Sequence, residues 1–462
     1  MEASPNPPVK DPHLPPMGRL GDLLCPRAPQ TIAEARLEEG ALVDLAIKFA
    51  FTINRFSADW LGERLRVCPA LSEAVVRQLS YEGLIEETMM TSHGKPMYRI
   101  TERGGRHAER AMEVNGYLGP APVSLEAYSA MLRWEFGRTP EVKPEHVTAA
   151  LANLVLTPRA VEMAGLAVSS GRSLFLYGPS GNGKSSLGRA IHSALQGDFW
   201  IPHCVAVRNN VIRLYDEQVH QRVEGGWDHT PAIDQRWVRI HRPMVVVGGE
   251  LTLDYLDLVY SPSLRYYEAP PHLKANGGVF LVDDFGRERV SPHQLLNRFI
   301  TPMEHQFDYF TLSTGQKIQV PLRQVLIIAT NLSLETVTDP AFLRRMGYRL
   351  CLEAPTPEQY AKIFTAYAAK HGATVAPEVL AGLLERYRAQ GRELRACEPR
   401  DLIERSRDIC RFHGKPLELT PDVLDVAWTG YFGTAQPPTQ GVVEAAGVPI
   451  DGLIAQKAAA AG

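Results

Sequence analysis

The sequence predicts an α/β fold whose core is a parallel β-sheet. Three continuous apolar runs, at residues 174–177, 279–282 and 325–329, have the length and composition of strands that are buried on both faces. Each run ends in glycine or polar residues, which is typical of the carboxyl edge of such a sheet, where ligands bind. The first run is followed by apolar residues at helical spacing: Leu187, Ala190, Ile191 and Ala194.

The turn between the first strand and this helix carries a phosphate-binding motif. Residues 178–185 read Gly-Pro-Ser-Gly-Asn-Gly-Lys-Ser, the full pattern G-x-x-x-x-G-K-S in its required place. Glycines let backbone N–H groups turn toward phosphate oxygens. We expect Lys184 to reach the β- and γ-phosphates of ATP and the Ser185 hydroxyl to bind Mg²⁺. The predicted ATP-binding residues are Gly178, Pro179, Ser180, Gly181, Asn182, Gly183, Lys184, Ser185 and Ser186.

The second apolar run delivers two carboxylates to the same edge of the sheet. Asp283 and Asp284 directly follow the strand, and Asp283 is predicted to hold Mg²⁺ together with Ser185. Residues 284–286 also match the Asp-Phe-Gly triplet of protein kinases. We reject a kinase, because no His-Arg-Asp loop precedes the triplet and the lysine loop belongs to another fold.

Composition and charge exclude several other classes of protein. A net charge of −3 gives no general attraction to nucleic acid or anionic lipid. The six cysteines form no C-x-x-C pair, which argues against a zinc or redox motif and fits a reducing cytoplasm. No apolar run approaches the roughly 18 residues of a membrane helix, and the Pro-rich start lacks the apolar core of a secretory signal. We therefore expect a cytoplasmic protein without a membrane partner.

The N-terminal third contains a small helical unit. Apolar spacing predicts helices over about 42–53, 57–65 and 71–83, then a strand, a turn and a strand over 85–100, and a last helix from Thr101. This order resembles a winged helix. Its third helix would expose polar residues, but Glu82, Glu86 and Glu87 offset much of the nearby positive charge. Binding to DNA and docking to a protein both stay open.

Three further motifs follow in the order that AAA+ ATPases have them. The strand over 324–330 ends at Asn331, residues 339–346 read Asp-Pro-Ala-Phe-Leu-Arg-Arg-Met, and residues 398–402 read Glu-Pro-Arg-Asp-Leu. From residue 170 to 405 the chain resembles that superfamily. The resemblance implies that Asn331 and Arg400 are sensors of the γ-phosphate, and that Arg344 or Arg345 is a finger acting on the neighbouring subunit's ATP. The alternatives are a helix N-cap at Asn331, solvated surface arginines, and an Arg400 ion pair with Asp401 or Glu404.

Two details refine the resemblance. Most relatives carry Glu where this chain has Asp284, the position that polarises the attacking water, so the shorter acid leaves the hydrolysis rate open. Residues 307–321 read as a hairpin directly before the sensor strand. Such a hairpin resembles that of MoxR-type ATPases, magnesium chelatases and bacterial enhancer-binding activators. The G-A-F-T-G-A loop of the activators is absent, which argues against transcriptional activation by their route.

The resemblance implies an α/β P-loop NTPase of AAA+ type with a C-terminal helical lid and an N-terminal winged-helix-like domain. The implied function is ATP hydrolysis by a ring homo-oligomer, expected to be a hexamer, that remodels an unknown protein client. The alternatives are a DNA-associated ATPase that docks through the winged helix, and a slow nucleotide-dependent switch. The predicted parts are a disordered arm (1–38), the winged-helix-like domain (39–116), a linker (117–144), the nucleotide domain (145–355), the lid (356–433) and a disordered tail (434–462).

Overall fold

The structure is a computed structural model that describes residues 11–38, 40–90, 94–225, 230–333 and 340–433. It divides into two compact units, Met1–Thr356 and Pro357–Gly462, which are treated separately here. The predicted tail at 434–462 and the first ten residues of the predicted arm lie outside the described ranges.

A five-stranded sheet forms the centre of the first unit. Its strand order is β11-β14-β17-β6-β18, and every neighbouring pair is parallel. The strands are β11 (Met244–Val247), β14 (Val279–Phe285), β17 (Val325–Thr330), β6 (Leu174–Tyr177) and β18 (Tyr348–Cys351). This confirms the predicted α/β class with a parallel sheet. The three apolar runs of the sequence are the central strands β14, β17 and β6.

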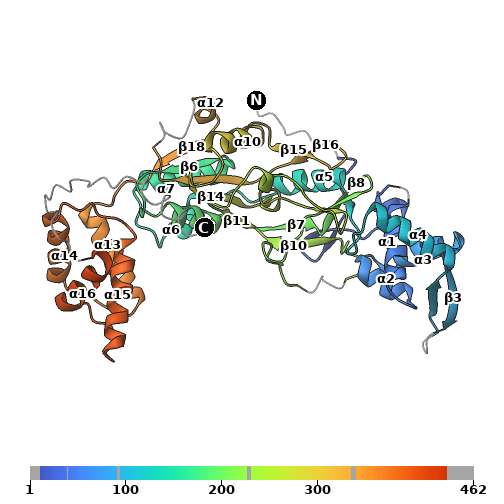
Figure 1. Cartoon of the computed structure of the whole chain (residues 1–462), viewed down its shortest axis with the longest axis horizontal. Helices are drawn as coiled ribbons and strands as arrows, with labels where there is room; N and C mark the ends of the chain where they lie inside the picture. The colour runs from blue at the N-terminus through green and yellow to red at the C-terminus, as the bar shows by residue number, and fades with distance from the viewer. Residues whose placement is uncertain (1–10, 39, 91–93, 226–229, 334–339, 434–462) are drawn as a thin grey trace, which may run out of the picture. The chain divides into compact units, whose positions relative to one another are not determined.

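Helices cover both faces of this sheet. Alternate residues of a strand point to opposite faces, so Leu174 and Leu176 lie in one apolar cluster and Phe175 lies in another. The first cluster includes α6 (Pro144–Leu151), α7 (Pro158–Ser170) and α8 (Lys184–His192). The second includes α10 (Pro292–His305) and α12 (Pro340–Leu343), whereas α9 (Pro271–Lys274) contributes Leu273 to a separate core. Figure 1 shows α6 and α10 on opposite sides of β14.

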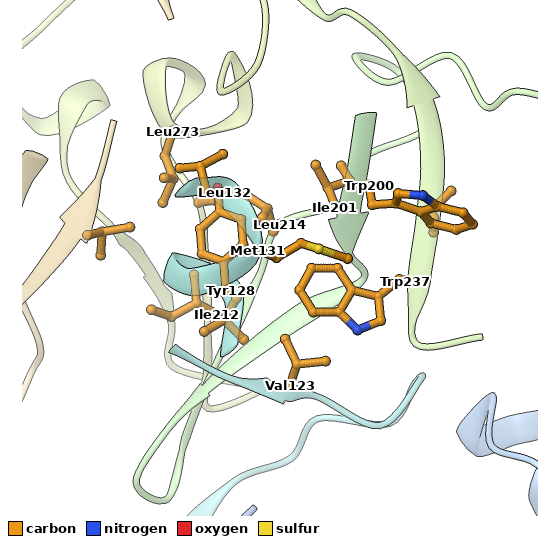
Figure 2. Close-up of a cluster of buried hydrophobic side chains, with 14 of the residues drawn as sticks. Val123, Tyr128, Met131, Leu132, Trp200, Ile201, Ile212, Leu214, Trp237 and Leu273 are labelled. Atoms are coloured by element: carbon orange, nitrogen blue, oxygen red, sulfur yellow. The ribbon is translucent and has the colours of Figure 1, made fainter. Parts of the chain in front are cut away.

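A second sheet, with both parallel and antiparallel pairs, was not predicted from the sequence. Its order is β12-β13-β9-β8-β5, and the pair β7–β10 lies beside it in one apolar core. The strands are β5 (Val123–Ser124), β7 (Asp198–Pro202), β8 (Cys204–Val207), β9 (Asn210–Arg213), β10 (Trp237–His241), β12 (Val259–Ser261) and β13 (Tyr266–Glu268). Figure 2 shows Trp200 and Trp237 packed in this core.

The segment predicted as a linker belongs to this core. It contains β5 and α5 (Leu125–Phe136), and Tyr128, Met131 and Leu132 of that helix are buried among the strands (Figure 2). The Tyr128 hydroxyl accepts a hydrogen bond of 2.8 Å from the Asn276 side chain. Residues 119–122 read Gly-Pro-Ala-Pro and end just before β5, so the part of the segment that follows them packs into this core.

The hairpin before the sensor strand is present as β15 (Phe307–Thr311) and β16 (Lys317–Pro321), which pair antiparallel. Its inward face, Phe310, Ile318 and Val320, is buried in the same core, whereas Tyr309 is exposed. Asp308 is also buried and contacts Arg298 and His272. Burial alone would raise the pKa of Asp308, but these two partners hold it below its usual value. The hairpin is therefore a packed part of the fold on one face.

The N-terminal region contains a short hairpin and a helical unit. The hairpin is β1 (Met17–Leu20) with β2 (Leu23–Pro26), followed by the turn η1 (Ala33–Ala35). The elements beyond are α1 (Ala41–Phe51), α2 (Ala58–Leu65), α3 (Pro69–Tyr81), β3 (Ile85–Met90), β4 (Pro96–Ile100) and α4 (Glu102–Val114). From residue 11 the structure differs from the predicted disordered arm, because Cys25 is buried and the Trp200 indole donates to the Leu24 carbonyl at 3.1 Å.

The second unit is helical. It contains α13 (Pro357–Lys370), α14 (Pro377–Ala389), α15 (Glu398–Phe412) and α16 (Pro421–Phe432), which close around Tyr360, Tyr387 and Trp428. Across the ranges that the structure describes, none of the helices has the length and apolar character needed to cross a membrane.

Candidate nucleotide-binding site

The phosphate-binding motif forms the turn between β6 and α8, as predicted. Gly178, Gly181 and Gly183 have φ values of 128°, 83° and 84°, a region that favours glycine. A Cβ on Gly178 would also lie 2.5 Å from the Leu352 carbonyl oxygen at the end of β18. Gly183 is the residue before α8, so the backbone N–H groups of the helix start face this turn. The backbone thus has the shape that a phosphate group requires.

Lys184 closes the turn on itself in this structure. Its Nζ donates to the carbonyl oxygens of Gly178 at 2.8 Å and Pro179 at 2.7 Å. Burial lowers the pKa of Lys184, and the nearby Asp284 and Asp283 oppose that shift. Of the other predicted contact residues, Asn182 is buried, and Ser180 and Ser186 are exposed. The Lys184 ammonium group is therefore held by the first two residues of the loop.

The two residues predicted to bind magnesium meet at the sheet edge. The Ser185 hydroxyl donates to Asp283 Oδ1 at 2.7 Å, and the Asp284 N–H donates to the same oxygen at 3.0 Å. A hydroxyl and a carboxylate oxygen are the hard ligands that Mg²⁺ takes, with water and phosphate completing its octahedron. The residues present therefore fit the ion, and Ser185 and Asp283 would hold it.

Asp284 stands in an unusual backbone conformation. Its φ is 52°, and the ladder between β14 and β17 shifts register between Val282 and Phe285. Aspartate tolerates this left-handed region better than longer acids do. Its Oδ1 accepts from the Asn331 side chain at 3.3 Å, and its Oδ2 lies 3.5 Å from an Arg287 guanidinium nitrogen. The structure thus brings Asp284 and Asn331 together, and it adds Arg287, which no sequence signal had indicated.

The candidate finger arginines differ in their surroundings. Arg345 is mostly buried and forms an ion pair with Glu304 of α10, whereas Arg344 is exposed. The Asp339 that precedes them lies outside the described residues. In the second unit, the Arg400 guanidinium donates to Asp401 Oδ1 at 2.9 and 3.0 Å. This is the ion pair that the sequence had left as the alternative to a sensor role.

The parallel sheet and the glycine-rich turn together define an α/β protein with a P-loop. A family model described as "Domain of unknown function (DUF8689)" matches residues 356–430, the helical second unit. No curated protein matches the chain.

Solved structures give distant matches to the fold. NtrX from Brucella abortus in complex with ADP is 16% identical, with a TM-score of 0.38, over 64% of this chain and 57% of that one. The same protein in complex with ATP is 16% identical, with a TM-score of 0.37, over 69% of this chain and 63% of that one. Thermotoga maritima RuvB, described as a Holliday junction branch migration motor, is 16% identical, with a TM-score of 0.34, over 63% of this chain and 70% of that one. This chain spans less than two thirds of either NtrX structure.

Replacing Lys184 by alanine should weaken ATP binding by roughly 10- to 150-fold, since a charge-assisted contact contributes about 1.5–3 kcal/mol. Titration with a fluorescent ATP analogue measures the change. Arg189→Ala is the matched control, because Arg189 is an exposed cation on the same helix, α8. Equal affinities for the Lys184→Ala protein and the control would rule out the phosphate-loop assignment.

Proposed function

We propose that this chain binds and hydrolyses Mg-ATP as a ring-shaped homo-oligomer and uses the energy to remodel a protein partner. The contact between Ser185 and Asp283 supports the nucleotide part most directly. It joins the phosphate loop to the acidic strand, although β17 lies between their strands in the sheet. A hydroxyl and a carboxylate beside a glycine-rich turn form a site for a metal-bound triphosphate.

Each residue of the site has a proposed task. Lys184 would exchange its two carbonyl partners for the β- and γ-phosphate oxygens. Asp284, which already accepts from the Asn331 amide, would orient the attacking water and take its proton, and Asn331 would fix that geometry. Mg²⁺ held by Ser185 and Asp283 would neutralise charge on the phosphate oxygens.

We assign the arginine finger to Arg344 rather than Arg345. The Arg345 guanidinium is already bound to Glu304 and largely buried, so using it in a neighbouring site would break that pair. Arg344 lies next to it in the sequence and is exposed, which leaves it available to another subunit. A finger that acts on the next subunit's ATP requires a head-to-tail contact, and such contacts close into rings when the rotation permits.

The charges of the N-terminal helical unit favour a protein partner over DNA. Residues 41–114 contain ten basic and ten acidic side chains. Four of the basic ones are each paired with an acid: Arg77 with Glu73, Lys95 with Asp59, Arg99 with Glu86 and Arg106 with Glu102. DNA binding depends on unpaired cations that replace counterions on the phosphates. Tyr81, Met89 and Met90 are exposed, and these residue types are enriched at protein interfaces.

We expect the full chain to show no salt-sensitive binding to duplex DNA. Fluorescence anisotropy with a labelled duplex at about 50 and 200 mM salt tests this, because proteins with several phosphate contacts lose about 10³-fold or more in affinity over that range. Weak binding that is equal at both salt concentrations agrees with the protein-remodelling proposal. Tight binding at low salt that falls steeply with added salt would support the DNA-associated alternative.

A slow nucleotide-dependent switch is the second candidate function. The observation that favours it is the ion pair between the short Asp284 carboxylate and Arg287, in which the guanidinium competes with water for one carboxylate oxygen. A switch of this kind would bind ATP tightly and turn it over slowly.

A further inference from the structure

The first unit contains a cavity of about 290 Å³ that shares no lining residue with the phosphate loop. Its walls come from three segments that are distant in the sequence: the N-terminal strap, defined as residues 13–36, the start of α5, and the start of β10. The volume is at the lower end of the range for pockets that bind small molecules. The cavity is therefore large enough for a compact ligand of one ring.

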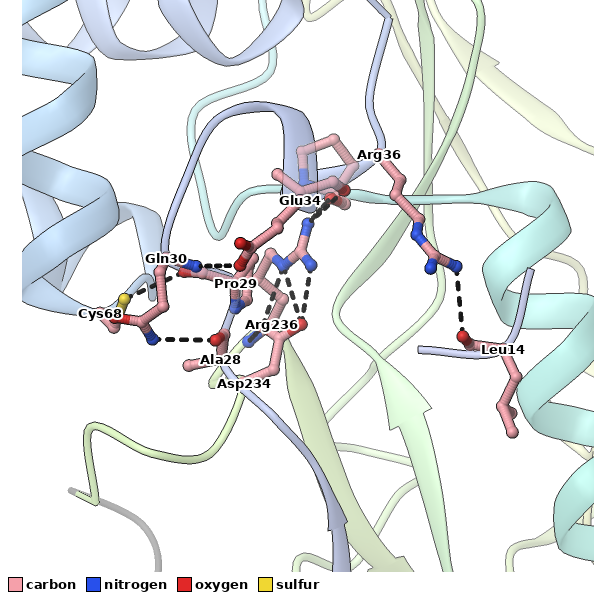
Figure 3. Close-up of polar contacts among 11 residues, drawn as sticks. Leu14, Ala28, Pro29, Gln30, Glu34, Arg36, Cys68, Asp234 and Arg236 are labelled. Carbon is pink, nitrogen blue, oxygen red and sulfur yellow. Dashed lines mark hydrogen bonds and ion pairs between the residues drawn. The ribbon is translucent and has the colours of Figure 1, made fainter. Parts of the chain in front are cut away.

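The strap is fixed to the rest of the unit by backbone hydrogen bonds, so the cavity is preformed. Ala28 donates to the Ala232 carbonyl at 3.0 Å, and Asp234 donates to the Pro26 carbonyl at 2.9 Å. Arg36 donates to the Pro12 and Leu14 carbonyls and so ties the end of the strap to its beginning (Figure 3). Arg36 has a φ of 52°, a strained conformation of the kind that is concentrated at binding sites.

A buried guanidinium forms part of the cavity wall. The side chains of Arg236 and Asp234 are 6% and 1% exposed, and they form an ion pair of 2.7 Å (Figure 3). Arg236 Nη1 donates to the carbonyls of Ala35 and Pro122, and Nε and one Nη2 hydrogen donate to Asp234. Arginine has five N–H groups. Within the described part of the chain, the fifth, on Nη2, has no acceptor within hydrogen-bond distance.

The remaining walls define the chemistry of the occupant. Val123, Ala127 and Pro29 give the cavity apolar sides, and Arg27 stands at its exposed rim. The carboxylates of Asp234 and Glu34 also line it; Asp234 is paired with Arg236, and Glu34 accepts from the Gln30 backbone N–H. The three guanidinium groups of Arg27, Arg36 and Arg236 outnumber these two carboxylates. A guanidinium that lacks one acceptor prefers a carboxylate oxygen, because the charge-assisted bond is the stronger kind. We propose that this cavity binds a small organic carboxylate, with its oxygens toward Arg236 and Arg27 and its apolar body against Val123 and Ala127.

Such a ligand would act as an effector of the N-terminal unit. Ala28 and Ala35 of the strap also belong to the apolar core that contains α1, α2 and α3. A molecule that contacts the strap, α5 and β10 at once would therefore hold this helical unit against the second sheet. It would stabilise the folded chain by an amount that grows with the logarithm of its concentration once that exceeds the dissociation constant.

The test uses sodium benzoate as the probe, with the full chain in saturating ATP so that the phosphate loop is filled. The midpoint of thermal unfolding should rise with benzoate concentration along the curve for one binding site, and benzamide, which has the same shape without the charge, should bind at least tenfold more weakly. Arg27→Gln should weaken benzoate binding, whereas Arg19→Gln, on β1 and outside the cavity, should not. Ala127→Leu should abolish the shift by filling the space.

The proposal is overturned if the midpoint of thermal unfolding does not rise with benzoate concentration, or if benzamide raises it equally. It is also overturned if Arg27→Gln binds benzoate as tightly as Arg19→Gln does. Because Arg27 is exposed, this pair of variants remains informative even if Ala127→Leu does not fold. If the Arg236–Asp234 pair only stabilises the fold and the cavity binds no carboxylate, neither Arg27→Gln nor Arg19→Gln will change the response to benzoate.

Discussion

Replacing Arg344 by alanine should lower the ATP turnover of the assembled protein by about 10³-fold or more, the contribution of arginine fingers in related phosphoryl transfer. The guanidinium would stabilise the charge that spreads over the phosphoryl oxygens in the transition state. ATP binding should stay within about threefold of the original, since the finger lies outside its own subunit's loop. Steady-state turnover and an ATP-analogue titration on the same preparation separate these two effects.

Arg345→Ala is the comparison that decides between the adjacent arginines. This change removes the ion pair with Glu304, whose carboxylate is exposed to solvent, so it should lower stability only slightly and reduce turnover less than tenfold. Arg159→Ala, an exposed change on α7, controls for the loss of a surface charge. If Arg345→Ala lost turnover and Arg344→Ala kept it, our assignment of the finger would be reversed.

Asp284→Asn should lower turnover by roughly 10²-fold or more while ATP still binds, because positioned general bases contribute on this scale. The amide keeps the shape of the side chain and its contact with Asn331, but it cannot take a proton. Single-turnover hydrolysis at saturating ATP measures the chemical step directly. Asp284→Glu keeps a carboxylate at this position and should therefore retain measurable turnover. The left-handed backbone at φ 52° disfavours the longer acid.

Arg287→Ala is the informative partner to these variants. If the ion pair with Arg287 keeps Asp284 from positioning water, Arg287→Ala should raise the rate of ATP hydrolysis, as the slow-switch alternative requires. A single-turnover rate that is the same with Asn, Glu or Asp at position 284 would show that this carboxylate is only structural.

The sequence predicted those parts of the site whose chemistry depends on residue type and short spacing. Buried strands precede the glycines of the loop, Lys184, Ser185 and Asp283. Because parallel strands end at a common edge of the sheet, the sequence predicted that these residues meet there. The contacts of Arg287 with Asp284 and of Glu304 with Arg345 could not be predicted, because neither ion pair leaves a pattern in a single sequence. The conformation of Asp284 depends on a register shift between two strands, which is a tertiary feature.

The second sheet was missed for a related reason. Its strands are only two to five residues long, too short for a period of two to stand out. The strap lies within residues 1–38, which the sequence predicts to be disordered because the start of the chain is rich in proline. Its structure depends on contacts with partners far along the chain, such as Trp200 and Asp234. Local propensity says nothing of such contacts.

Mixing two inactive variants tests most directly whether hydrolysis takes place between subunits. Arg344→Ala keeps Lys184, and Lys184→Ala keeps Arg344, so a mixed ring contains interfaces that have both. We predict that an equal mixture hydrolyses ATP well above the sum of its separate parts, and that specific activity rises with protein concentration. Turnover that is independent of concentration, with a mixture no more active than its parts, would contradict the account.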